Sequence, residues 1–276
     1  MTQWQLNRTY RSTSGEVRWT ALGEDGAPPL VLLHGTPFSS YVWRGVARAL
    51  SARFRVHAWD MPGYGASAQA AGQDVSLRKQ AEVFTELLAH WGLTAQEPTV
   101  VAHDFGGYVA LRAHLAHGAR YRRLALVGPT ALPGWGSATY RLLGEHPDVF
   151  AQLPTALHRA LVTEYISSAS SPGLHPSVLE QLVAPWCTQE GQPAFYRQIE
   201  QNGLLSTADL KEEYGKVSVP TLVSWGAEDA WNPVALAHDL AALIPDARLH
   251  LFEGAGHLVQ EDAPAELTAV LGAFAA

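Results

Sequence analysis

Short apolar runs alternate with amphipathic helical patterns along most of this chain. The runs are rich in Val and Leu, which is typical of strands buried on both faces of a sheet. We predict a hairpin within 3–22 and strands over 30–33, 54–59, 99–102, 124–127, 217–224 and 247–251. Helices are expected over 39–50, 76–91, 105–117 and 234–244, and from residue 263 onward. This alternation predicts an α/β fold with a mostly parallel central sheet flanked by helices.

The alternation breaks between residues 129 and 215. This segment contains several helical patches that are interrupted by prolines such as Pro147 and Pro176. We therefore expect a core domain formed by residues 1–128 and 216–276, with a helical segment over 129–215 inserted after the sixth strand.

The turn after the 99–102 strand carries the main candidate for chemistry. Its residues, Ala102-His103-Asp104-Phe105-Gly106, have the spacing small-x-nucleophile-x-Gly and lead directly into a helical pattern. Small residues are needed there because a Cβ would clash in so sharp a strand-to-helix turn. The apex of such a turn usually holds Ser, and here it holds Asp104. The helix that follows favours an ionised carboxylate at its N-terminus.

Composition and charge exclude several classes of function. Hydrophobic residues make up 47% of the 276 residues and charged ones 16%, which fits a large buried core rather than disorder. A net charge of −7 argues against nucleic acid or an anionic membrane as a partner. The single cysteine, Cys187, excludes an internal disulfide and a cysteine-rich metal site. With no signal-peptide pattern and no membrane-length apolar run, we expect a cytoplasmic protein.

Together these motifs resemble the α/β-hydrolases, and within them the members with an aspartate nucleophile, such as epoxide hydrolases and haloalkane dehalogenases. The resemblance implies a helical cap over residues 129–215 and a catalytic triad in the chain order Asp104, Asp229, His257. The spacing Gly226-x-x-Asp selects Asp229 over the neighbouring Glu228, and Gly-Ala-Gly-His after the last strand singles out His257. The resemblance also implies an enzyme without metal or cofactor.

A carboxylate nucleophile predicts attack on an sp³ carbon. Asp104 is ionised near neutral pH and needs no base, so its attack would displace a leaving group and form an alkyl ester. His257, held by Asp229, would then activate water to hydrolyse that ester. The backbone N–H groups of Thr36, in a His-Gly-x-Pro turn, and of Phe105 would form the oxyanion hole.

The leaving group distinguishes an epoxide hydrolase from a dehalogenase. In the resembling families, haloalkane dehalogenases have a Trp after the nucleophile to bind halide, whereas this chain has Phe105, which lacks an N–H donor. Epoxide hydrolases use cap tyrosines to protonate the alkoxide. The segment Phe195-Tyr196-Arg197 resembles the one that carries such a tyrosine, and Tyr140 and Tyr165 are candidates for its partner.

The sequence therefore favours epoxide hydrolysis to a diol, with a small apolar organic substrate, water as the second substrate, and a monomer or homodimer as the assembly. A dehalogenase with the same triad is the first alternative, because Trp135 and Trp186 in the predicted cap could donate indole N–H bonds to a halide. A non-catalytic ligand-binding protein on this scaffold is the second. A serine esterase is not expected, because position 104 is not Ser.

Overall fold

The computed structural model describes residues 4–202 and 207–276, and these contain one eight-stranded sheet in the order β1-β2-β4-β3-β5-β6-β7-β8. The β1–β2 and β2–β4 pairs are antiparallel, and every later pair is parallel. This arrangement confirms the predicted fold class. The strands are β1 Arg8–Ser12, β2 Gly15–Leu22, β3 Pro29–Leu33, β4 Arg55–Trp59, β5 Thr99–His103, β6 Arg123–Val127, β7 Thr221–Gly226 and β8 Arg248–Phe252.

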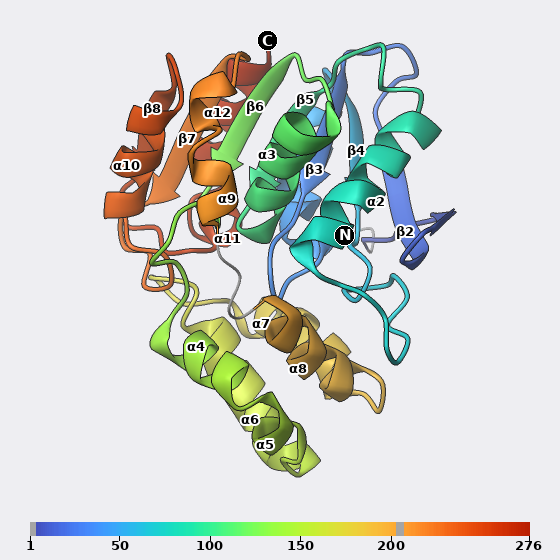
Figure 1. The fold of residues 1–276 in the computed structure, drawn as a ribbon, viewed down its shortest axis with the longest axis vertical. Coiled ribbons are helices and arrows are strands. Elements are labelled where there is room, and N and C mark those ends of the chain that lie inside the picture. The colour runs from blue at the N-terminus through green and yellow to red at the C-terminus, as the bar shows by residue number, and fades with distance from the viewer. Residues whose placement is uncertain (1–3, 203–206) are drawn as a thin grey trace.

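Helices cover both faces of the sheet. Figure 1 shows α2 and α3 side by side in front of the strands, while α1 packs against α12. The central strands are fully buried because both faces are covered, which explains their continuous apolar runs. The helices of this core are α1 Arg44–Leu50, α2 Leu77–His90, α3 Phe105–His117, α10 Ala235–Leu243, α11 Val259–Asp262 and α12 Pro264–Ala275, with a 3-10 helix over Ser40–Trp43.

The chain between β6 and β7 is helical, as its broken pattern suggested. Two of its prolines, Pro147 and Pro176, occupy the first turns of helices, where the missing N–H costs nothing. Figure 1 shows α4 to α8 beyond the carboxyl ends of β6 and β7, whereas α9 lies beside α3. The helices are α4 Ala138–Glu145, α5 Pro147–Ala151, α6 Thr155–Ser167, α7 Pro176–Val183, α8 Gly191–Asn202 and α9 Ala208–Lys211, with 3-10 turns over Ala184–Cys187 and Tyr214–Lys216.

Most element boundaries lie within one residue of the sequence prediction, and two elements differ by more. The strand expected over 217–224 begins only at Thr221, because Pro220 has no N–H for the ladder and only its carbonyl accepts a bond, from Leu124. The helix expected over 39–50 is divided into a 3-10 turn and α1. None of the helices within residues 4–202 and 207–276 is long and apolar enough to cross a bilayer.

The contact between α3 and β3 depends on Gly106. A Cβ on Gly106 would lie 2.7 Å from the carbonyl oxygen of His34 and 2.8 Å from the Cβ of Leu33. Both obstacles belong to or adjoin the backbone, so they cannot rotate away. The glycine therefore allows α3 to start directly above the end of β3.

We expect Gly106→Ala to lower the free energy of unfolding by about 1–3 kcal/mol, because overpacking at this contact must displace backbone. Gly45→Ala is the matched control, since no atom lies within 4 Å of the added methyl group in α1. The control should raise stability by up to about 1 kcal/mol through helix propensity. Urea unfolding measures both changes, and equal midpoints for the two variants would contradict the role given to Gly106.

Candidate active site

The turn between β5 and α3 holds Asp104 in an unusual backbone conformation. Its φ is +50° and its ψ is −118°, a region that costs a non-glycine residue about 1–3 kcal/mol. Backbone hydrogen bonds on both sides offset this strain. The Asp104 N–H donates to the Val127 carbonyl, and the Asp104 carbonyl accepts from the N–H groups of Gly107 and Thr130. The predicted sharp turn is therefore present, and Asp104 stands at its apex.

Each oxygen of the Asp104 carboxylate accepts a hydrogen bond. Oδ1 accepts from the backbone N–H of Thr36 at 2.7 Å, and Oδ2 accepts from the hydroxyl of Thr130 at 2.9 Å. Burial alone raises the pKa of Asp104, but His257, His103 and the Phe105 N–H outweigh burial and lower it below the usual value. Asp104 is therefore ionised at neutral pH although only 3% of its surface is exposed.

His257 joins the two carboxylates that the sequence assigned to the triad. Its Nδ1 lies 2.9 Å from Oδ2 of Asp229, and its Nε2 lies 3.5 Å from Oδ2 of Asp104. The other oxygen of Asp229 accepts the N–H groups of Trp231 and Asn232, which fixes the carboxylate. Glu228, the rejected neighbour, is exposed and accepts a bond from Ser171 instead. Asp104, Asp229 and His257 thus come together in one buried cluster.

The charges around His257 determine its protonation. Burial lowers the pKa of His257, but Asp229 and Asp104 outweigh burial and raise it to about 10. His103 lies beside it, with ring centroids 4.7 Å apart, and burial together with the charge on His257 lowers the pKa of His103 to about 3. At neutral pH the site therefore holds a protonated His257 between two carboxylates and a neutral His103.

An aromatic stack that the sequence analysis did not identify supports His257. Trp231 stacks on the imidazole at 5.0 Å between centroids, and Tyr165 from α6 stacks on the opposite side of Trp231 at 4.4 Å. The Trp231 indole donates to the hydroxyl of Ser168, which links it to the inserted helices. Neither Trp231 nor Thr130 belongs to a motif that sequence spacing could have singled out.

Tyr140 and Tyr165 are the cap tyrosines that lie near Asp104. Burial raises the pKa of both well above the usual value, and the charge of Asp104 raises each further. Both hydroxyls therefore keep their protons. The Tyr140 ring is 98% buried and packs against Phe105 and Trp135. Within the part of the chain that the structure describes, its hydroxyl has no hydrogen-bond partner.

The hydroxyl proton of Tyr196, the tyrosine that the sequence favours as proton donor, is engaged by a neighbouring histidine. Tyr196 lies 2.9 Å from Nδ1 of His158, and Nε2 of the same ring lies 2.9 Å from the carbonyl of Trp186. A carbonyl only accepts, so Nε2 carries the imidazole proton and Nδ1 accepts the proton of Tyr196. Burial lowers the pKa of His158, which agrees with this neutral form. Tyr196 has no second proton to donate to a substrate.

The indole of Trp186, which the sequence offers as a donor to halide, is likewise engaged. Its indole N–H donates to the carbonyl of Pro37 at 2.7 Å, so it is not available to a halide. Trp135 is different, since it lies in an edge-on contact with Phe105, the residue that follows Asp104. Of the two cap indoles that the sequence proposed, only Trp135 has no hydrogen bond within residues 4–202 and 207–276.

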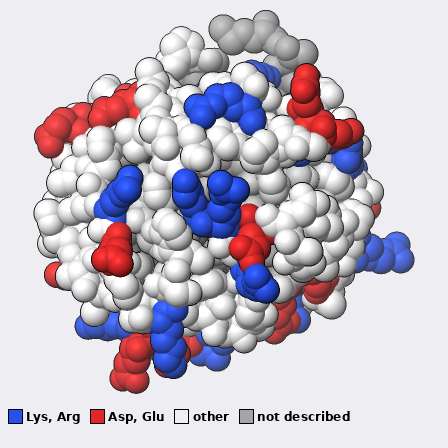
Figure 2. Space-filling model, turned by 90° about the horizontal axis from the view of Figure 1, so that it is seen from above, with Lys and Arg blue, Asp and Glu red and all other residues white. Residues whose placement is uncertain are grey.

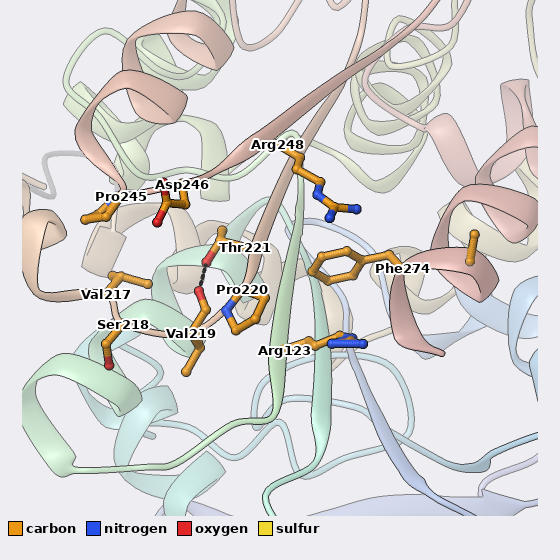
Figure 3. A pocket seen from close by; sticks show the side chains of 11 residues that line it. Arg123, Val217, Ser218, Val219, Pro220, Thr221, Pro245, Asp246, Arg248 and Phe274 are labelled. Carbon is orange, nitrogen blue, oxygen red and sulfur yellow. Dashed lines mark hydrogen bonds between the residues drawn. The ribbon is translucent and has the colours of Figure 1, made fainter.

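A surface cleft of about 380 Å³ lies at the other end of the sheet (Figure 3). It is lined by residues that begin strands, including Arg123 of β6, Thr221 of β7 and Arg248 of β8. Figure 2 views the molecule from this end, where several basic side chains gather near the centre of the face. Asp104 follows the carboxyl end of β5, so this cleft is not part of the triad site. Among the described residues, no group of three or more His, Cys, Asp or Glu side chains could hold a metal ion.

Comparisons with known proteins agree with this architecture. A family model described as the alpha/beta hydrolase fold matches residues 28–264. The pimeloyl-[acyl-carrier protein] methyl ester esterase of Nitrosomonas europaea is 31% identical over 240 residues, which are 83% of this chain and 88% of that protein. A solved alpha/beta hydrolase fold protein from Burkholderia ambifaria is 41% identical, with a TM-score of 0.93 and 98% of each chain covered.

A solved ancestral haloalkane dehalogenase, AncHLD2, has a TM-score of 0.82 over 97% of this chain and 98% of its own, at 20% identity. At that identity the likeness concerns the fold alone. The family model, by contrast, matches well over half of the chain. The chain therefore belongs to the family of hydrolases with the alpha/beta hydrolase fold.

Proposed function

We propose that this hydrolase opens a small organic epoxide through an ester on Asp104 and releases a diol. The observation that carries the proposal is the buried, unpartnered hydroxyl of Tyr140, which lies in the field of the ionised Asp104 beside a second protonated tyrosine, Tyr165. An epoxide needs a nucleophile on carbon and a proton donor on oxygen. Asp104 and Tyr140 supply these two groups.

In the first step Oδ2 of Asp104 attacks a ring carbon, while Oδ1 stays bound to the Thr36 N–H. The ring C–O bond breaks, and its electron pair goes to the epoxide oxygen. That oxygen takes a proton from Tyr140 or Tyr165, so no free alkoxide forms. The product of this step is a hydroxyalkyl ester on Asp104, and the ester carries no charge.

Loss of the Asp104 charge prepares the second step. The charge of Asp104 is one of the two that hold the pKa of His257 near 10, so forming the ester lowers that pKa. His257 then releases its proton. This proton restores the hydroxyl of the tyrosine that protonated the substrate. The neutral imidazole is now a base, which it was not while Asp104 was ionised.

In the second step His257 takes a proton from water, and the water oxygen attacks Cγ of the ester. The Thr36 and Phe105 N–H groups stabilise the charge that develops on Oδ1. The bond between Cγ and Oδ2 then breaks, and Oδ2 leaves with the diol and receives the proton from His257. Asp104 is now a carboxylic acid with one oxygen from water, and it passes its proton to His257, which restores the ionised carboxylate and the protonated imidazole.

Two other hydrolytic reactions compete with this proposal. The relative from Nitrosomonas europaea is an esterase by name, but a carboxylate that attacks an ester would form a labile anhydride. Dehalogenation uses the same Asp104 attack and is favoured by one observation, the position of Trp135 against Phe105. It remains the second candidate, with the Trp135 indole and the two tyrosines as donors to the halide.

His257→Gln should trap the ester, because Gln cannot accept the proton of water. With an epoxide, the peptide that contains Asp104 should gain the full mass of the substrate. With a haloalkane, it should gain that mass less the hydrogen halide. Mass spectrometry after a single turnover distinguishes the two, and the double variant with Asp104→Asn is the control that should form no adduct. Absence of any adduct with a substrate that turns over would refute the ester.

Tyr140→Phe should lower kcat/KM for epoxides by about 10²-fold or more, because it removes a proton donor used in the transition state. Tyr196→Phe is the matched control, since it deletes a hydroxyl that already bonds to His158 in the same group of helices. Its kcat/KM should stay within about threefold of wild type, as the change touches no reacting atom. Equal losses in both variants would remove Tyr140 from the mechanism.

Asp104→Asn should lower the pKa of His257 from about 10, because one of its two carboxylate neighbours loses its charge. The wild-type imidazole is protonated below pH 10, so across pH 7–9 the variant should lose protons that the wild type keeps. A ¹⁵N NMR titration of His257 measures this directly. An unchanged titration would show that Asp104 does not control the base.

A further inference from the structure

The Gln198 side chain on α8 has a polar atom that the fold leaves unused. The residue is 1% exposed, and its Oε1 accepts from the hydroxyl of Thr36 at 2.8 Å and from that of Tyr64 at 3.1 Å. Its Nε2 is buried and has no hydrogen-bond partner within residues 4–202 and 207–276. A buried NH₂ group without an acceptor is unfavourable, because it loses its hydrogen bonds to water.

This amide lies next to the nucleophile. Thr36 holds the amide through its hydroxyl and holds Oδ1 of Asp104 through its backbone N–H. Tyr64, the second partner of Oε1, also interacts electrostatically with Asp104, Tyr140 and Tyr165. The unused NH₂ group therefore belongs to a side chain that contacts Thr36 of the proposed oxyanion hole and Tyr64.

A count of donors indicates what this group binds. An epoxide oxygen has two lone pairs, and Tyr140 and Tyr165 can occupy both. A third donor then has no acceptor on the ring. A purely structural role also leaves the group unexplained, since Oε1 alone makes both contacts that fix the side chain.

We propose that Gln198 is a specificity residue whose Nε2 donates to a second oxygen of the substrate, placed beside the epoxide ring. The preferred substrates are then epoxides with an ether, carbonyl or hydroxyl oxygen next to the ring, rather than plain hydrocarbon epoxides. This inference rests on the proposed epoxide hydrolysis and names the substrate class for the same site.

Two epoxides of matched shape test the proposal. Phenyl glycidyl ether carries an ether oxygen beside the ring, and 4-phenyl-1,2-epoxybutane has CH₂ in its place. Wild type should show a kcat/KM roughly fivefold higher for the ether, which is the effect of one net hydrogen bond. The ratio of the two values is the readout, because a change that only weakens folding or the common chemistry leaves it unaltered.

Gln198→Glu keeps an oxygen for Thr36 and Tyr64 and replaces the NH₂ group by a second carboxyl oxygen. Gln198→Met removes both functions at similar length without adding an ionisable group. Both variants should bring the ratio close to one. Gln192→Glu is the control on the same helix, since its amide is half-buried and donates to the backbone carbonyl of Leu153. It should keep the wild-type ratio.

The possible results distinguish the role of Gln198 from the epoxide hydrolysis on which it rests. If both epoxides are hydrolysed but the wild-type ratio is near one, or survives in both Gln198 variants, the assignment of Gln198 is overturned and epoxide hydrolysis stands. If wild type hydrolyses neither epoxide and forms no adduct in the His257→Gln background, the proposed function fails, and the assignment of Gln198 fails with it.

Discussion

The buried charge interaction between Asp104 and His257 is the constraint on which this site depends. Burial disfavours both charges. His257, with its Nε2 3.5 Å from Oδ2 of Asp104, is the largest influence that keeps Asp104 ionised, and Asp229 and Asp104 together keep His257 protonated. The strained backbone of Asp104 lies at the sharp β5–α3 turn, which presents the carboxylate to His257. The sheet, the β5–α3 turn and the loop after β8 therefore all position Asp104 and His257.

This interaction also explains why the fold alone does not reveal the reaction. The chain shares its architecture with an esterase relative and with a distant dehalogenase, so the sheet and its helices are compatible with several chemistries. The difference lies in the group at the apex of the turn. A hydroxyl there would need a base to become a nucleophile, whereas an ionised Asp104 keeps His257 protonated at neutral pH.

Local sequence predicted the core and the triad because local rules determine them. The elbow follows from small residues around Asp104, and Asp229 follows from its spacing to Gly226. The hydrogen bonding of the cap residues could not be predicted in this way. Whether Tyr196 or Tyr140 has a free hydroxyl depends on which helix packs opposite, and Trp186 is satisfied by Pro37, 149 positions earlier in the chain. Thr130 acts on Asp104 only because β6 ends beside β5.

Buried polar atoms without hydrogen-bond partners indicate a function here only because several of them lie around one carboxylate. Trp59 and Gln80 also have such atoms inside the core, so an unused donor does not by itself indicate a function. Around Asp104, however, the Tyr140 hydroxyl, the Gln198 amide and Nε2 of His257 are all left without a hydrogen bond. Trp19, His57 and Trp91 also bring three such atoms together in the core, so what distinguishes the three around Asp104 is that they lie around an ionised carboxylate. Their common neighbour indicates that a substrate and a water molecule complete the hydrogen bonding of this site.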